Sequence, residues 1–213
     1  MSNKAFPAVV IGVVALIAFG STWALLKSLT QSAPRGVTTS GEPFEPRVPD
    51  FEFTDQSGNR VTAGILDGHY TVLDFMFTNC PLWCPGMTQA MAQVQDATAG
   101  GSLRFLSISI DGSRDTPERL AEWAAEYDAD LDRWSFLTGA PNQVWPIVGA
   151  LGFDVSFDDQ LTLNLDDGST MANINHPTRL LLVAPDRRVI GMYAYQSPED
   201  IDALIERARE LAP

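Results

Sequence analysis

The chain has few of the side chains that bind metals or nucleic acids. Its 213 residues include two cysteines and two histidines, which excludes an iron–sulfur cluster because such a cluster needs more cysteines. Lysine occurs only at positions 4 and 27, and residues 31–213 carry 12 arginines against 27 acidic side chains. Because this acidic surplus repels phosphate backbones, we expect that the protein does not bind nucleic acid.

One long apolar run stands at the start of the chain, at residues 5–26. As a helix it would be roughly 33 Å long, close to the thickness of a bilayer's hydrocarbon core. No A-x-A cleavage site follows it, and no cysteine is available for lipid attachment. We therefore expect residues 1–27 to form a single N-terminal membrane anchor with a transmembrane helix. The rest of the chain would lie on the periplasmic side of the cell membrane, and a cleaved signal peptide would imply the same compartment.

The remainder of the chain divides into a linker and one domain. Residues 28–48 are rich in Ser, Thr, Gly and Pro and predict a flexible tether, whereas residues 49–213 contain alternating strand and helix patterns. Their order predicts an α/β fold in which helices flank a mixed sheet, the thioredoxin-like order with extensions. The predicted elements are a hairpin at 49–62, strands at 69–77, 103–110 and 134–139, helices at 85–99, 115–129, 142–152 and 197–212, and a hairpin at 179–194. Residues 153–174 predict an inserted, half-exposed hairpin that turns at Asp167 and Gly168.

Both cysteines lie in "FTNCPLWCPGMTQAM", residues 77–91, where Cys80 and Cys84 are separated by three residues at a predicted strand-to-helix turn. A structural disulfide here would close a loop of about five residues and stabilise the fold by only ~2 kcal/mol, which argues against that purpose. Redox chemistry remains open, although the thioredoxin motif is C-x-x-C. The third interpretation is a metal site, since soft thiolates favour copper, zinc or iron–sulfur.

The metal that Cys80 and Cys84 could bind depends on which histidine can join them as a ligand. A structural zinc site needs four ligands. His69 begins the strand whose far end leads to Cys80, so it lies on the order of 25 Å away. His176 precedes the penultimate strand, and in a thioredoxin-like order its loop faces the turn that carries the cysteines. Two sulfurs and one imidazole suit copper, which accepts soft donors and low coordination numbers.

Several neighbouring side chains allow two interpretations. Met87 and Met91 share a helical face and are expected to pack in the core, with thioether ligation as the alternative. Trp83 is expected to be exposed, where it could shield a metal, contact a partner or pack on its own loop. Asp111, Arg114 and Asp115 are expected to cap a helix, with tuning of the thiol pKa as the alternative. The acidic residues of the inserted hairpin are expected to be solvated, or else to steer a cationic partner.

Four segments of the chain resemble a known family, the SCO/SenC copper chaperones. "FTNCPLWCP" is similar to the family's F-T-x-C-P-x-x-C-P, and "SIDGSRDTPERL" to its S-x-D-P-x-x-D-T-P-x-x-L segment. "NHPTRLLLVAPDRRVIGMY" resembles its single-histidine strand and hairpin, and the inserted hairpin is also a family trait. The resemblance covers about residues 45–211. The chain departs from the family pattern at four positions, which are Leu82, Gly112, Asn175 and Pro177.

The resemblance implies a membrane-anchored, thioredoxin-like protein whose copper ligands are Cys80, Cys84 and His176. It also implies delivery of copper to the binuclear copper centre of a respiratory oxidase, or to another cuproprotein, and reduction of that centre's cysteines. We therefore expect a copper chaperone rather than an enzyme. The alternative is an extracytoplasmic thiol–disulfide oxidoreductase that has no obligatory metal and uses Cys80 and Cys84 as a redox pair.

Overall fold

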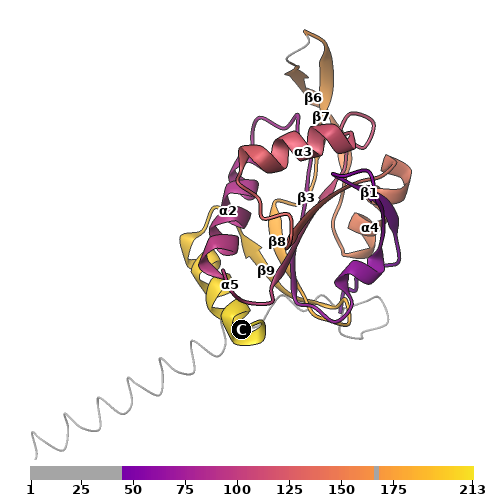
Figure 1. Cartoon of the computed structure of the whole chain (residues 1–213). Coiled ribbons are helices and arrows are strands. Elements are labelled where there is room, and N and C mark those ends of the chain that lie inside the picture. Colours follow the sequence, from indigo (N-terminus) through magenta and orange to yellow (C-terminus); the bar gives the residue numbers. More distant parts are fainter. Residues whose placement is uncertain (1–44, 166–167) are drawn as a thin grey trace, which may run out of the picture. The chain divides into compact units, whose positions relative to one another are not determined.

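The domain is built around a seven-stranded mixed sheet with the strand order β2-β1-β5-β4-β3-β8-β9. The structure, a computed structural model, describes residues 45–165 and 168–213 (Figure 1). Its strands are β1 (Glu52–Asp55), β2 (Arg60–Thr62), β3 (Thr71–Met76), β4 (Arg104–Ser109), β5 (Trp134–Thr138), β6 (Ser156–Asn164), β7 (Thr170–Asn175), β8 (Arg179–Val183) and β9 (Val189–Ala194). Its helices are η1 (Ala63–Leu66), α2 (Cys84–Ala97), α3 (Pro117–Glu126), α4 (Pro141–Ala150) and α5 (Pro198–Leu211).

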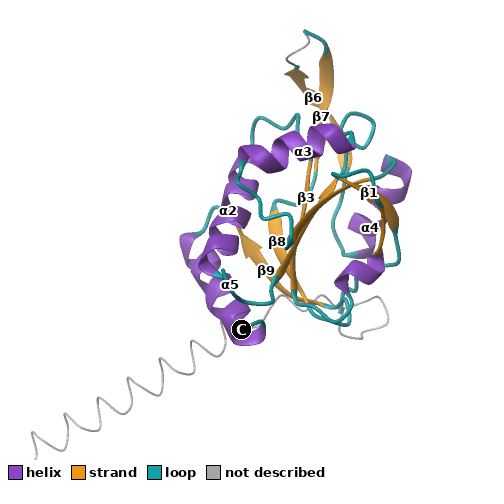
Figure 2. Ribbon diagram, in the orientation of Figure 1, coloured by secondary structure: helices purple, strands orange, loops and turns teal. Residues whose placement is uncertain are grey.

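The centre of the sheet is parallel and fully buried. β3 pairs in parallel with β4, and β4 with β5, whereas β8 joins the other edge of β3 in the antiparallel sense. Every residue of β3 is buried, as expected for a strand that is covered on both faces. Figure 2 shows α2, α3 and α5 on one side of the sheet and α4 on the other. The predicted mixed sheet flanked by helices is confirmed.

The inserted hairpin forms a separate two-stranded sheet from β6 and β7. It projects from the domain next to α3 (Figure 1), and most residues of β6 are exposed. One link to the body is the Trp145 ring of α4, whose centroid lies 5.1 Å from that of Phe157. The predicted turn at Asp167 and Gly168 lies partly outside the described residues. Gly168 has a positive φ of 81°, which suits a tight turn.

The beginning of the domain differs from the predicted boundary. Residues 46–48, assigned from sequence to the linker, pair with the β8–β9 turn: the Val48 N–H donates to the Arg187 carbonyl, and the Val189 N–H to the Pro46 carbonyl. The Val48 side chain is buried. The predicted anchor and most of the linker lie outside the described residues. Among the residues that are described, no helix is long and apolar enough to cross a membrane.

Candidate metal centre

The two cysteines lie on either side of a short loop between β3 and α2. Both sulfurs are buried, since Cys80 is 2% exposed and Cys84 0%. Pro85 stands in the first turn of α2, where its missing N–H leaves no helical bond unmade. Backbone amides donate hydrogen bonds to both sulfurs. The Phe77 N–H donates to Cys84 Sγ and the Trp83 N–H to Cys80 Sγ, each with an N···S distance of 3.4 Å. The loop therefore points both thiols toward the same space.

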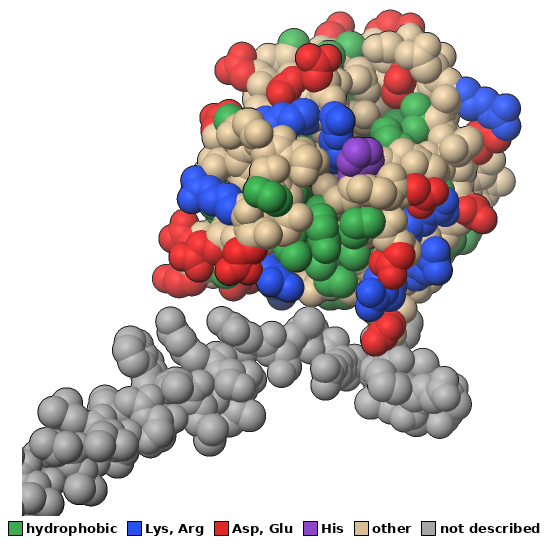
Figure 3. Space-filling view, turned by 60° about the horizontal axis from the view of Figure 1, so that its bottom comes forward, with side chains coloured by type: hydrophobic (Ala, Val, Ile, Leu, Met, Phe, Trp, Pro, Cys, Tyr) green, Lys and Arg blue, Asp and Glu red, His purple; other side chains and the backbone are tan. Residues whose placement is uncertain are grey.

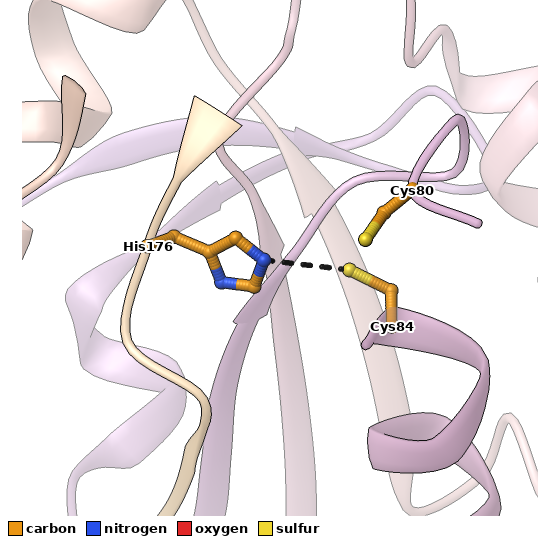
Figure 4. Close-up of side chains that lie close together, drawn as sticks. All are labelled: Cys80, Cys84 and His176. Carbon is orange, nitrogen blue, oxygen red and sulfur yellow. Dashed lines mark hydrogen bonds between the residues drawn. The ribbon is translucent and has the colours of Figure 1, made fainter. Parts of the chain in front are cut away.

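His176 reaches that space from the other side. It follows β7 and leads into β8, and because β8 runs antiparallel to β3, the segment before β8 lies beside the segment after β3. The Nε2 atom lies 3.6 Å from Cys84 Sγ (Figure 4). Its Nδ1 atom lies 3.0 Å from the Pro177 carbonyl oxygen, which places the ring proton on Nδ1 and leaves the Nε2 lone pair facing the sulfurs.

The three side chains form one compact donor set. The Sγ atoms of Cys80 and Cys84 and a ring nitrogen of His176 all lie within 4.8 Å of one another, and no other such group of three occurs among the described residues. His69 is exposed and precedes β3, so it takes no part, as the strand geometry predicted. A single ion between these atoms would have two sulfur donors and one nitrogen donor.

The two thiols differ in acidity. The neighbouring Cys84 thiol lowers the pKa of Cys80 to about 4, more than offsetting its burial, and His176 and the Trp83 N–H act in the same direction. Burial raises the pKa of Cys84 well above its usual value, and Cys80 raises it further. Near neutral pH the pair therefore carries one thiolate, on Cys80, and one thiol, on Cys84. A thiolate is the form that attacks disulfides and binds metals.

The sequence analysis overlooked an acidic residue in the middle of β3. Asp74 is fully buried, and neither of its carboxylate oxygens has a hydrogen-bond partner in the described part of the chain. Burial raises the pKa of Asp74 to about 6. The Ser107 hydroxyl and the charge of His176 oppose this rise, although Ser107 lies outside hydrogen-bond geometry. Its charge in turn raises the pKa of Cys84. The signal was one acidic residue within the otherwise apolar segment "TVLDFM".

Asp115 supports the cysteine loop and does not cap α3. Its carboxylate accepts hydrogen bonds from the Thr78 amide (3.1 Å), the Thr78 hydroxyl (2.6 Å) and the Ser109 hydroxyl (2.5 Å). The cap of α3 is Thr116, whose hydroxyl accepts from the Arg119 N–H. The expectation that Asp115 caps a helix was therefore wrong. It fixes the loop two residues before Cys80.

The remaining neighbours are assigned by their exposure. Met87 and Met91 are fully buried, which confirms the expectation that they pack inside the domain. Trp83 is 45% exposed, as expected. The acidic residues Asp154 and Asp159 are exposed at and beside β6, which agrees with a solvated hairpin.

Comparison with known proteins identifies sequence relatives over most of the chain. The sequence model of the SCO1/SenC family matches residues 40–212. A SCO1 protein homolog from Bacillus subtilis is 37% identical over 100 residues, covering 46% of this chain and 52% of that protein. A putative copper-binding protein from Stutzerimonas stutzeri is 29% identical over 153 residues, which is 65% of this chain and 74% of that protein.

A solved structure has the same architecture. BsSco, described as a member of the Sco family of cytochrome c oxidase assembly proteins and as having a disulfide switch, superposes with a TM-score of 0.62 at 26% identity. The match covers 80% of this chain and 95% of that one. The predicted thioredoxin-like arrangement is thus shared by a member of that family.

Proposed function

The chain belongs to the SCO1/SenC family, and from this premise we propose that it binds a copper ion through Cys80, Cys84 and His176. We further propose that it delivers the ion to the binuclear copper centre of a respiratory oxidase. The observation that supports this most is the donor set of two sulfurs and one imidazole nitrogen within 4.8 Å. Thiolate and imidazole suit copper, and carboxylate sites that favour Mg²⁺ or Ca²⁺ are a different donor class.

The arrangement suits an ion that must be released again. Cys80 is already a thiolate near neutral pH, so copper binding requires the loss of one further proton, from Cys84. The Nδ1 proton of His176 is held by the Pro177 carbonyl, which keeps Nε2 available as a ligand. Three donors also leave room on the ion for a ligand from an acceptor.

A second candidate function uses the same cysteines without metal. The low pKa of Cys80 and the adjacent protonated Cys84 are what a dithiol reductant needs. The Cys80 thiolate would attack an acceptor disulfide and form a mixed disulfide, and Cys84 would then displace the acceptor. Two electrons pass to the acceptor, whose two sulfurs take up protons, and Cys80 and Cys84 end as a disulfide.

The proposal includes a location at the cell membrane. The apolar run at residues 5–26 has the length and composition of a single membrane-spanning helix. We propose that it anchors the chain in the cell membrane, with residues 45–213 on the periplasmic side near a membrane-bound oxidase.

A Cu(I) titration of the reduced full chain, purified in detergent with a competing chelator, tests the proposal. We expect one Cu(I) per chain in the wild type and an affinity lower by on the order of 100-fold in Cys80→Ser, about 2.7 kcal/mol. His69→Ala, which alters the histidine outside the donor set, should bind as the wild type does. The oxidised wild type should not bind, because a disulfide offers no thiolate. Wild-type affinity in Cys80→Ser would favour the reductase.

A further inference from the structure

Two large apolar side chains protrude beside the buried donor set. Leu82 and Trp83 are each 45% exposed, and with Leu131 and Phe157 they are the four exposed large hydrophobic residues among those described. Leu131 follows α3, and Phe157 rests on the Trp145 ring in the inserted hairpin. Only Leu82 and Trp83 are adjacent, and they lie between the two cysteines. We call this pair the Leu82–Trp83 ridge.

An aromatic side chain from another element also lies at the start of α2. Tyr195, after β9, lies directly on the first turn of α2, since a Cβ atom on Gly86 would be 2.8 Å from the Tyr195 ring. Tyr195 is half-buried. Aromatic and aliphatic side chains from two elements thus lie at the loop and helix start that carry the cysteines. Tyr and Trp are the residues most enriched at the energetic centres of protein interfaces.

The two chain segments that carry these side chains contain no charged residue, although the chain is strongly acidic. Residues 75–95 contain no Asp, Glu, Lys or Arg, and neither do residues 189–198, although 19% of the whole chain is charged. Depletion of charge at the centre with apolar side chains exposed distinguishes an interface core from ordinary surface. A solvated loop of this chain would be expected to carry acidic side chains, as the inserted hairpin does.

The burial of the donor atoms determines what must touch this surface. Cys80 and Cys84 are 2% and 0% exposed, so an acceptor's ligand reaches the ion only when the acceptor is seated against the loop. We propose that the Leu82–Trp83 ridge, with Tyr195, is the docking surface for a copper-accepting protein that surrounds its own cysteine thiols with an uncharged, apolar rim. This inference rests on the proposed function and names the chemistry of its partner.

The transfer step balances without a redox partner. Two acceptor thiols give up their protons and bind Cu(I), while the bonds from copper to Cys80, Cys84 and His176 break. Cys84 takes up one of the protons, the other passes to solvent because Cys80 stays a thiolate, and copper stays Cu(I) throughout. The ridge contributes by holding the two sets of sulfurs in contact, so its removal should slow transfer to a protein without weakening copper binding.

The test compares two variants of the full chain in detergent, each loaded with Cu(I). Leu82→Ala/Trp83→Ala removes the ridge. Leu131→Ala is the matched control, because its side chain is 49% exposed and it precedes β5 at the end of the sheet where β3 begins, opposite the cysteine loop. The acceptor is the reduced, metal-free soluble domain of a respiratory oxidase subunit with a binuclear copper centre. We expect the double variant to slow transfer to this domain at least about tenfold. Transfer to a small Cu(I) chelator, and Cu(I) affinity, should match the wild type.

Other outcomes overturn the inference in distinguishable ways. Wild-type transfer by the double variant, or an equal loss in Leu131→Ala, would show that the ridge does not dock the acceptor. A wild type that binds Cu(I) but transfers none to the oxidase domain would overturn both the docking surface and oxidase delivery, and a wild type that binds none would overturn the proposed function first. A wild type that dimerises in sedimentation, with a monomeric double variant, would assign the ridge to self-association.

Discussion

Asp74 is the residue whose surroundings fit its side chain least well. A fully buried carboxylate without hydrogen bonds costs free energy whenever it is ionised. Its charge raises the pKa of Cys84, and the charge of His176 opposes the rise in its own. Natural proteins rarely keep such a group unless it has a role, and its electrostatic coupling with the donor set gives it one.

We predict that Asp74 makes the stability of the metal-free, reduced protein fall with rising pH. Its folded pKa of about 6 lies above the value of about 3.9 for an unfolded aspartate. The stabilising contribution of protonated Asp74 to folding is therefore complete below about pH 4 and is lost as the pH rises through about 6. The free energy of unfolding of Asp74→Asn, relative to that of the wild type, should therefore be higher at about pH 7.5 than at about pH 4 by roughly 2–3 kcal/mol.

Urea unfolding at the two pH values measures this difference. Asp159→Asn, which alters an exposed acid in the inserted hairpin, is the control and should keep the wild-type pH dependence. A constant offset between Asp74→Asn and the wild type at both pH values would mean that Asp74 does not titrate in this range.

At the scale of elements, the cysteine loop depends on a brace from the next strand and helix. Thr78 donates two hydrogen bonds to Asp115, Ser109 at the end of β4 donates another, and the Arg119 Nε–H of α3 donates to the Thr78 hydroxyl. The three bonds to Asp115 are buried, and the bond from Arg119 is partly buried. The loop between Cys80 and Cys84 is thereby tied to the core, although Leu82 and Trp83 are exposed.

We predict that Asp115→Asn destabilises the protein at neutral pH by about 1–3 kcal/mol, because an amide cannot accept all three donors. Denaturant unfolding of the metal-free chain measures the loss, again with Asp159→Asn as the control. Cu(I) affinity should fall in the Asp115 variant as well, since the loop that carries Cys80 loses its fixed position. A change within about 0.5 kcal/mol, which is typical of surface substitutions, would contradict the role given to this brace.

The sequence predicted elements well where one local pattern decides them. The largely apolar strands β3 and β4 were predicted at their places in the chain, and so were the helices over residues 115–129 and 197–212, where α3 and α5 lie. Long-range polar contacts were not predictable in this way. Asp115 and Thr78 are 37 residues apart, and the local sequence around Asp115 predicted a helix cap instead. The packing of residues 46–48 on the β8–β9 turn was missed for the same reason.

At the scale of the molecule, the topology brings distant residues together. Cys84 and His176 are 92 positions apart, yet the antiparallel pairing of β3 and β8 puts the end of one beside the start of the other. The strand order predicted this meeting without any contact information, whereas the unpaired Asp74 and the Tyr195 ring near Gly86 needed the packed structure. On the face drawn in Figure 3, acidic and basic side chains lie around a patch of hydrophobic side chains.

The central claim is that Cys80, Cys84 and His176 form one copper site, and Cu(II) binding by two histidine variants tests it most directly. Cu(II) prefers nitrogen-containing tetragonal sites, whereas Cu(I) tolerates two thiolates. We predict that folded, reduced His176→Ala keeps measurable Cu(I) affinity but loses most of its Cu(II) affinity and the sulfur-to-copper absorption, while His69→Ala behaves as the wild type. Wild-type Cu(II) affinity and absorption in a folded His176→Ala chain would contradict the claim.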